Sequence, residues 1–175
     1  MEERDSETIQ EAVDPVLAEL FGPTHVIAGL KATTREAVLA EVVDQVGTRG
    51  LVKDARWLEA ALGERERMVP TAMPNGVAFL HARHRAAEKF PKQFLFLARS
   101  DEGVAFGSPD ERPTHLFFLL ALRKDMAHLR WLARLSWICR NRSVVANLLK
   151  APDAEEIVRV LKLAVAELPG NLRQR

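Results

Sequence analysis

The chain has 175 residues, of which 47% are apolar and 28% charged, with a formal net charge of +1, which suits one globular domain and excludes a disordered or fibrous chain. No apolar run approaches the roughly 20 residues that a membrane helix needs, and the start over residues 1–5 is too acidic for a signal peptide. Cys139 is the only cysteine, which excludes an intrachain disulfide and indicates a structural thiol in a reducing cytoplasm, without membrane insertion.

The first third of the chain is expected to be mainly helical. A helix over residues 6–21 has one apolar face, formed by Ile9, Val13, Val16, Leu17 and Leu20. A short strand over 25–30 follows. The next helix is capped by Thr34 and stops at Gly47, and another helix covers 54–66.

The middle of the chain changes to the two-residue period of strands, separated by turn signals. Strands are expected over 77–80, 93–97, 103–106 and 115–122. The remainder is helical, over roughly 125–140, 142–150 and 153–167. Helices on either side of a block of strands predict the fold class: an α/β single domain with a mixed β-sheet of about five strands flanked by helices on both sides.

The charges are distributed unevenly. Residues 1–20 carry seven acidic side chains and one arginine, whereas residues 123–142 carry six basic side chains and one acid. The basic segment either steers an acidic partner or is a solvated helix face, and the sequence leaves both open. A nucleic-acid partner is not expected, because the domain is not strongly basic and has no recognisable motif.

One histidine stands where chemistry is usually found. His81 follows the strand over 77–80 directly and precedes a basic loop, so a rigid element would hold it at an accessible edge. His84 lies nearby, but two histidines alone are too few ligands for a zinc site, and we expect no metal.

The segment around His81 is similar to the fructose/mannitol/nitrogen-regulatory type of IIA component of the bacterial phosphotransferase system. Arg65-Glu66 and Thr71 fall in register with the family pattern, and residues 75–81 (Asn-Gly-Val-Ala-Phe-Leu-His) match its Asn-Gly-Ile-Ala-Ile-Pro-His. Downstream, residues 103–110 resemble a family hairpin and residues 127–135 resemble its helix beginning with His-Leu.

The resemblance implies a IIA-like phosphotransferase domain over 24–168, preceded by an N-terminal helical extension over 1–23 and followed by a tail over 169–175. His81 would accept a phosphoryl group from an HPr-like phosphohistidine carrier. It would then pass the group to a IIB partner or signal to a transporter or kinase. The residues expected to bind phosphate or support the transfer are Arg65, Thr71, Arg83 and His128. No cofactor is implied, and no Gly-rich nucleotide loop occurs.

Helical spacing around His128 predicts an inward face with Trp131 and Leu135. Arg134 and Trp137 fall on the opposite, solvent-facing stripe, where so large an apolar side chain suggests a partner contact. Without the resemblance, His128 would be taken as a satisfied core histidine.

Three residues depart from the family pattern close to His81 in the sequence. Leu80 replaces a proline, Ala72 replaces a glycine, and Pro74 replaces a second glycine and removes a backbone donor. These departures leave a second hypothesis open. In that hypothesis the chain is a degenerate IIA-like regulatory module that docks a partner without efficient phosphotransfer.

Overall fold

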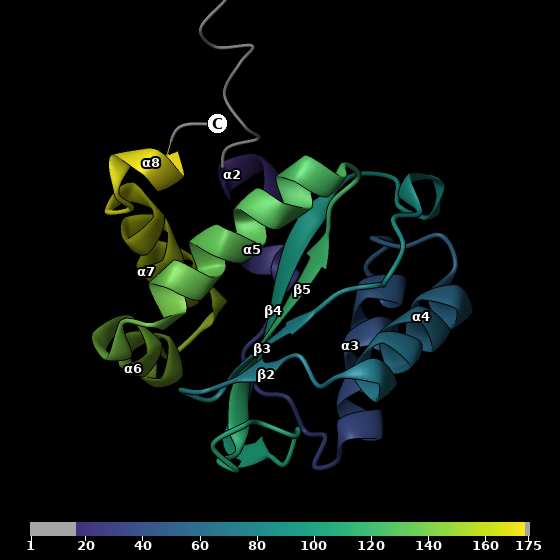
Figure 1. Cartoon of the computed structure of the whole chain (residues 1–175), viewed down its shortest axis with the longest axis horizontal. Coiled ribbons are helices and arrows are strands. Elements are labelled where there is room, and N and C mark those ends of the chain that lie inside the picture. Colours follow the sequence, from purple (N-terminus) through teal and green to yellow (C-terminus); the bar gives the residue numbers. More distant parts are fainter. Residues whose placement is uncertain (1–16, 174–175) are drawn as a thin grey trace, which may run out of the picture.

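The computed structural model of the chain describes residues 17–173, which form one mixed sheet between two layers of helices (Figure 1). Its strands are β1 (Val26–Ile27), β2 (Ala72–Met73), β3 (Val77–Leu80), β4 (Phe94–Val104) and β5 (Thr114–Ala121), in the order β1-β4-β5-β3-β2. The pairs β1–β4 and β3–β5 are parallel, and β4–β5 and β2–β3 are antiparallel. The expected fold class is confirmed.

Two helical layers cover the two faces of the sheet. One layer contains α3 (Arg35–Thr48) and α4 (Ala55–Met68). The other contains α2 (Leu17–Leu20), α5 (Asp125–Cys139), α6 (Arg142–Lys150) and α7 (Ala154–Ala166), and α8 (Gly170–Arg173) contacts α5. Short 3-10 turns cover Pro23–His25 and Ala87–Lys89.

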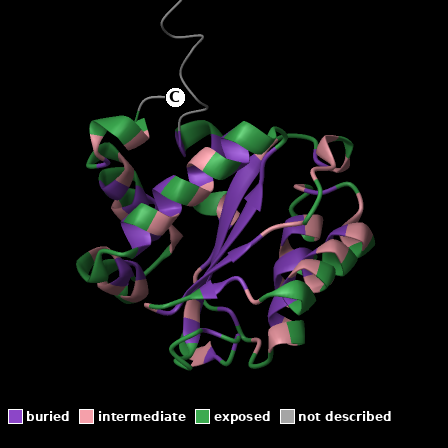
Figure 2. Ribbon diagram, in the orientation of Figure 1, coloured by how far each residue is buried: buried purple, intermediate pink, exposed green. Residues whose placement is uncertain are grey.

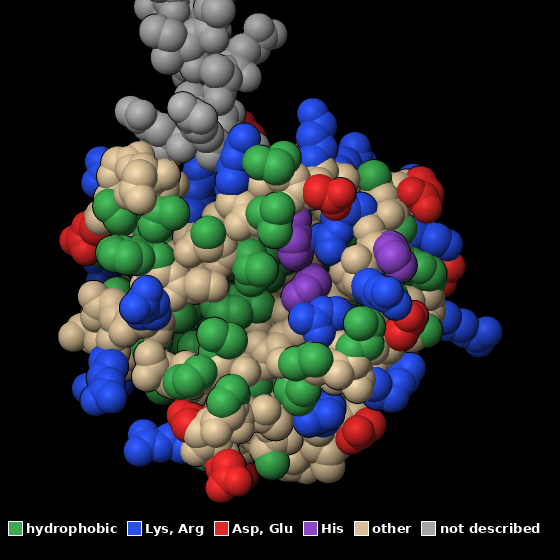
Figure 3. Space-filling view, viewed as in Figure 1, with side chains coloured by type: hydrophobic (Ala, Val, Ile, Leu, Met, Phe, Trp, Pro, Cys, Tyr) green, Lys and Arg blue, Asp and Glu red, His purple; other side chains and the backbone are tan. Residues whose placement is uncertain are grey.

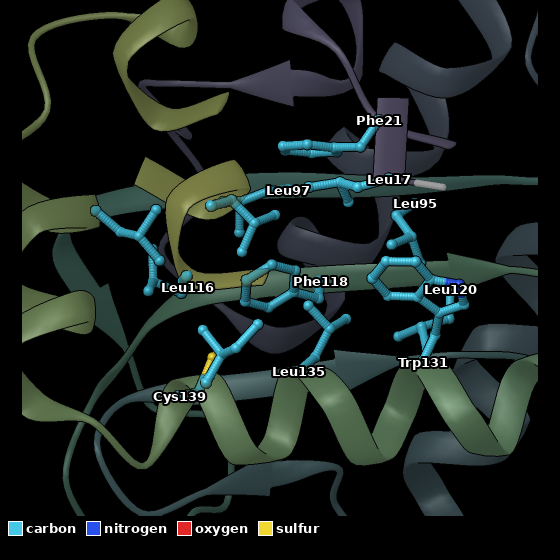
Figure 4. Close-up of a cluster of buried hydrophobic side chains, with 14 of the residues drawn as sticks. Leu17, Phe21, Leu95, Leu97, Leu116, Phe118, Leu120, Trp131, Leu135 and Cys139 are labelled. Carbon is cyan, nitrogen blue, oxygen red and sulfur yellow. The ribbon is translucent and has the colours of Figure 1, made fainter. Parts of the chain in front are cut away.

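Side chains of the strands alternate strictly between two hydrophobic clusters, as the pleat requires. Leu95, Leu97 and Phe118 face α5 (Figure 4), whereas Phe94 and Phe96 face α3 and α4. The sheet is buried along most of its length (Figure 2). The same alternation in β3 determines on which face of the sheet the next residue, His81, lies.

The helix boundaries follow from their caps. The hydroxyl of Thr34 accepts the N–H of Ala37, as expected, and the carboxylate of Asp54 accepts the N–H of Trp57. Both caps satisfy first-turn donors that lack a partner within the helix.

The strand predictions need three corrections. Residues 93–97 and 103–106 were expected as two strands, but the single strand β4 (Phe94–Val104) joins them, ends before Ala105, and has a register shift between Arg99 and Val104. The residues that suggested a turn form a bulge within this strand, where Gly103 has a φ of 81°. The short β2 was not expected, and the strand over 25–30 is reduced to Val26–Ile27.

The predicted helix over 6–21 and the predicted tail over 169–175 are only partly described. Residues 17–20 of that helix form α2. Residues 170–173 of the tail form α8. The rest of both segments lies outside the described residues.

Arg134 is buried, against its expected place on the solvent-facing stripe. Its Nε donates to the carbonyl of Leu172 at 2.8 Å, and its guanidinium lies 4.9 Å from the ring of Trp131, because α8 covers this side of α5.

Trp137, by contrast, is 49% exposed, as expected. Cys139 is buried, which raises the pKa of its thiol to about 12 and agrees with a structural role. Within residues 17–173, no helix has the length and apolarity to cross a bilayer.

Candidate functional site

The alternation of β3 brings His81 to the α5 side of the sheet. Val77 and Phe79 face the cluster under α5, so His81, two residues further, continues on that face. His128 lies in the first turns of α5 and is buried. The centroids of the two imidazole rings are 4.9 Å apart, so the two histidines predicted from the sequence meet in space.

The hydrogen bonds of His81 define its tautomer. Its Nδ1 lies 2.8 Å from the carbonyl oxygen of Phe79, and because a carbonyl only accepts, Nδ1 carries the proton. Its Nε2 accepts the Nε–H of Arg65 at 3.2 Å. Burial lowers the pKa of His81 below its usual value, and the charges of Arg65 and Arg85 lower it further. At neutral pH the ring is uncharged, with the lone pair on Nε2.

Arg65 is held in the last turn of α4 and points at this lone pair. Its Nη1 donates to the carbonyl of Val69 at 2.7 Å, which fixes the guanidinium while its Nε faces His81. A guanidinium so placed next to the nucleophilic nitrogen is in position to donate to the oxygens of an incoming phosphoryl group. The expected role of Arg65 in binding phosphate stays a prediction.

Thr71 lies near the site, but its side chain is already engaged. Its N–H donates to a carboxylate oxygen of Glu66 at 3.0 Å, and its hydroxyl donates to the other oxygen. Glu66 is buried, and that burial raises its pKa. In this arrangement the Glu66–Thr71 pair joins the end of α4 to the start of β2. Thr71 therefore offers no free hydroxyl in this state, and its expected contact with phosphate stays a prediction.

His128 is a neutral neighbour of His81. Burial lowers its pKa to about 4, with smaller contributions from the charges of Arg85 and His81. Its Nδ1 is buried, and no hydrogen-bond partner for it occurs in the described part of the chain. A buried ring nitrogen without a partner is unusual, which sets His128 apart from the satisfied core histidine that the sequence also allowed.

The basic loop after His81 presents a different arginine from the one expected. Arg83 is exposed, and within residues 17–173 it makes no hydrogen bond or ion pair. Arg85 is partly buried, donates to the carbonyl of Ala82 at 2.7 Å and lies 3.7 Å from the carboxylate of Asp125. The sequence contained both arginines, but only the path of the loop shows that Arg85 is the one beside the histidines.

The three residues that depart from the family pattern, Ala72, Pro74 and Leu80, have no positive φ angle. Positive φ angles in the β2–β3 turn fall on Asn75 (75°) and Gly76 (73°), so Ala72, within β2, needs no left-handed conformation. Pro74 belongs to the turn at the far end of β3, roughly 13 Å of strand away from His81. Its missing N–H therefore lies at the opposite end of β3 from His81. Leu80 is fully buried and pairs with Leu119 of β5.

Exposed apolar side chains lie on the elements that carry the site. Met68 and Val69 lie at the end of α4, which holds Arg65, and Met126 and Leu129 lie at the start of α5, close to His128 in the sequence. In Figure 3, histidine side chains lie beside both basic and hydrophobic ones on this face. Such a rim around a polar site is typical of a surface that another protein covers.

The described residues contain no cluster of three or more histidine, cysteine, aspartate or glutamate side chains that could hold a metal ion. His81 and His84 are therefore not joined by further ligands within that part of the chain.

Comparison with solved structures places the fold among the IIA components of the phosphotransferase system. Enzyme IIA mannitol of Escherichia coli, solved in complex with phosphorylated enzyme IIB mannitol, has a TM-score of 0.70 at 23% identity, covering 81% of this chain and 96% of that one.

The sequence matches a family model over residues 19–164, described as phosphoenolpyruvate-dependent sugar phosphotransferase system, EIIA 2. The chain belongs to this family.

Two curated relatives differ in their extent. The nitrogen regulatory protein of Bradyrhizobium diazoefficiens is 29% identical over 152 residues, which are 86% of this chain and 97% of that protein. The mannitol-specific EIICBA component of Escherichia coli is 25% identical over 91% of this chain, but the match spans only 25% of that protein's length. The chain thus corresponds to the whole of the first relative and to one part of the second.

Proposed function

We propose that this protein is a phosphocarrier whose acceptor atom is Nε2 of His81. The observation that carries the proposal is the hydrogen bonding of one ring: Nδ1–H donates to the carbonyl of Phe79, and the lone pair of Nε2 faces Arg65. A neutral imidazole with a fixed free nitrogen is a competent nucleophile at neutral pH. Membership of a phosphotransferase-system family supports a donor that is a phosphohistidine protein of the HPr type.

The transfer step needs no proton movement at Nε2. The lone pair attacks phosphorus, the bond between phosphorus and the donor's ring nitrogen breaks, and that nitrogen keeps the electron pair. The ring of His81 becomes positively charged, and the carbonyl of Phe79, which already accepts from Nδ1–H, stabilises that charge. Arg65 leaves Nε2 and donates to the phosphoryl oxygens instead.

His128 and Arg85 complete the proposed site. The ring of His128 lies next to that of His81 and has an unpartnered buried nitrogen, so it is in place to hydrogen-bond the phosphoryl group. Arg85 adds positive charge on the same side. Thr71 supports the phosphate site through Glu66, and Arg83 is left as an exposed, peripheral charge.

The downstream partner is proposed to be a IIB domain or a regulated protein such as a transporter or kinase. The complex of the Escherichia coli mannitol IIA and IIB proteins supports the first, and the Bradyrhizobium nitrogen regulatory protein supports the second. The apolar rim formed by Met68, Val69 and Leu129 would contact the donor and the acceptor in turn.

Intact-mass spectrometry tests the proposal directly. After incubation with phosphoenolpyruvate, enzyme I and HPr at neutral to alkaline pH, the protein should gain one phosphoryl group, and His81→Ala should gain none while keeping its circular dichroism spectrum. His84→Ala, in the neighbouring exposed histidine, is the matched control and should be phosphorylated normally. Phosphorylation of His81→Ala would refute the assignment. No gain in any variant would favour a docking module without phosphotransfer.

A further inference from the structure

A cavity lies between the second half of α5 and the β2–β3 hairpin. Its volume is about 610 Å³, which falls within the roughly 300–1,000 Å³ that small-molecule sites usually have. In Figure 3, hydrophobic side chains gather around a hollow on this face of the molecule. The lining includes neither His81 nor His128 nor Arg65, so the cavity is separate from the histidine site.

The buried part of the lining is apolar. It is formed by Val77 and Phe79 of β3 and by Cys139 of α5. Ser136 of α5 adds one hydroxyl. Asn75 also lines the cavity, but its Nδ2 already donates to the carbonyl of Cys139 at 3.2 Å. An occupant therefore meets an apolar wall with few polar groups that are still available for hydrogen bonds.

One end of the cavity is positively charged. Arg140 follows α5 and Arg142 begins α6, and no acidic side chain is among the described residues that line the cavity. Within residues 17–173, neither arginine forms an ion pair with a carboxylate. Arg142 also lines a second cavity, of about 380 Å³, together with Arg112. Positive charge is thus concentrated where α5 ends and α6 begins, and it would attract an anion to this end.

The lining selects the chemical class of the occupant. The apolar wall requires an apolar body, and the charged end requires an anion. A carboxylate fits an arginine well, because the planar guanidinium donates two parallel hydrogen bonds to its oxygens. A sugar does not fit, because its hydroxyl groups would lose hydrogen bonds to water that this lining cannot replace.

We propose that the cavity binds a small organic carboxylate with an apolar chain, of the chemical class of the medium-chain fatty acids. The carboxylate lies at Arg140 and Arg142, and the chain runs along β3 to Phe79. Such binding does not depend on phosphotransfer, so it goes beyond the proposed function. The carbonyl of Phe79 accepts the Nδ1–H of His81, so the ligand contacts the residue that fixes the tautomer of that ring.

Titration of the full chain with sodium octanoate, followed by NMR, tests the proposal. The readouts are the methyl signals of Val77 and the backbone amide signal of Phe79, because both residues line the cavity. Neither readout requires a phosphoryl donor. Octylammonium chloride, which has the same chain length and the opposite charge, is the matched ligand control.

Three variants separate the contributions of charge and space. Arg140→Gln/Arg142→Gln removes the charged end of the cavity. Its control, Arg56→Gln/Lys162→Gln, removes two exposed basic side chains from α4 and α7. Ser136→Phe places a large ring in the cavity, and its circular dichroism spectrum shows whether the fold is kept.

Octanoate should shift both sets of signals with a Kd of about 0.1–1 mM, as expected for so small a ligand, and octylammonium should bind at least about tenfold more weakly. Loss of the two arginines should weaken octanoate binding about tenfold, whereas the control pair should leave it unchanged. The phenylalanine variant should show no shift.

Three outcomes would overturn the proposal. The first is the absence of any shift with octanoate at about 10 mM, well above the expected Kd. The second is equal binding of octanoate and octylammonium, or equal binding of octanoate by the arginine variant and its control. The third is signals that move with protein concentration alone, together with dimers in sedimentation, which would assign the cavity to a second copy of the chain. Failure of phosphorylation would refute the proposed function and leave this test unaffected.

Discussion

His81 and His128 show how strongly an environment sets the chemistry of one residue type. Burial and nearby arginines keep both rings neutral. The two rings differ in their hydrogen bonds, because both ring nitrogens of His81 have a partner, whereas Nδ1 of His128 has none among the described residues. In the proposed transfer, the neutral state leaves a lone pair for attack, and the nearby arginines donate to the phosphoryl oxygens. The positive charges that add to the effect of burial on the histidine pKa values would thus also bind the phosphoryl group.

The three arginines of the site should differ in their effect on transfer. Arg65→Ala should slow phosphorylation about 100-fold, as expected for the loss of a preorganised donor, because its Nε faces Nε2 of His81. Arg85→Ala should have a smaller effect, and Arg83→Ala almost none, since Arg83 is exposed. Single-turnover transfer from phosphorylated HPr measures all three. Equal effects of Arg65→Ala and Arg83→Ala would show that the wrong arginine has been placed at the phosphate.

His128 should make the protein less stable in acid. Its pKa is about 4 in the folded chain against a usual 6.5, so between these values the unfolded chain binds more protons. The free energy of unfolding should therefore fall as the pH falls from about 6.5 to about 4. His128→Gln should show a smaller fall in urea titrations over this window. The raised pKa of Glu66 acts in the opposite direction, but it is common to both proteins and cancels in the comparison. Identical pH dependence would mean that His128 is not a buried neutral group.

At the scale of elements, the β2–β3 hairpin determines where His81 emerges. Its register pairs Ala72 with Ala78 and Met73 with Val77, and the turn between the strands needs two consecutive left-handed residues. Asparagine tolerates this conformation better than most residues, and glycine tolerates it freely. A slip of one residue would turn His81 away from α5.

Asn75 should therefore be sensitive to substitution in a specific way. Asn75→Ala places an unfavourable residue at a φ of 75° and should cost about 1–2 kcal/mol of unfolding free energy. Asn75→Gly keeps the backbone conformation but loses the hydrogen bond from Nδ2 to the carbonyl of Cys139, so it isolates that contribution. Chemical denaturation of both variants measures the difference. An Asn75→Ala variant as stable as Asn75→Gly would refute the role of the turn conformation.

At the scale of the whole molecule, one buried arginine joins segments far apart in the sequence. Arg99 of β4 donates to the carbonyls of Ala28, Leu148 and Ala151, linking the segment after β1 to the end of α6. It thus joins the end of α6 to the sheet, and it lies outside the histidine site.

Arg99→Met should destabilise the protein by about 3 kcal/mol, because buried carbonyls lose a charged donor while the side-chain volume is nearly kept. Urea denaturation followed by circular dichroism measures the change. Arg159→Met, in an exposed helical ion pair with Glu156, is the control and should have a much smaller effect. If the two variants are equally stable, the hydrogen bonds of Arg99 do not contribute significantly to the free energy of unfolding.

Much of the fold followed from local patterns. The two-residue period placed most of the strands, and Thr34 capped its helix as expected. The path of β4 and the short β2 did not follow, because a bulge and an edge strand depend on pairing with distant residues. The burial of Arg134 depended in the same way on α8, a helix nearly 40 residues later in the chain.

The sequence determined the identity of the central histidine, since His81 ends an apolar strand within a recognisable motif, and it indicated Arg65 and His128. The fold decided what the motif could not: that Arg85 and not Arg83 approaches the rings, that Thr71 is engaged by Glu66, and that Pro74 is remote from the site. The physical reason is that secondary structure reflects interactions between near neighbours in the chain. A hydrogen-bond partner or a pKa instead depends on distance in space, which is set only when the sheet and its two helical layers have packed.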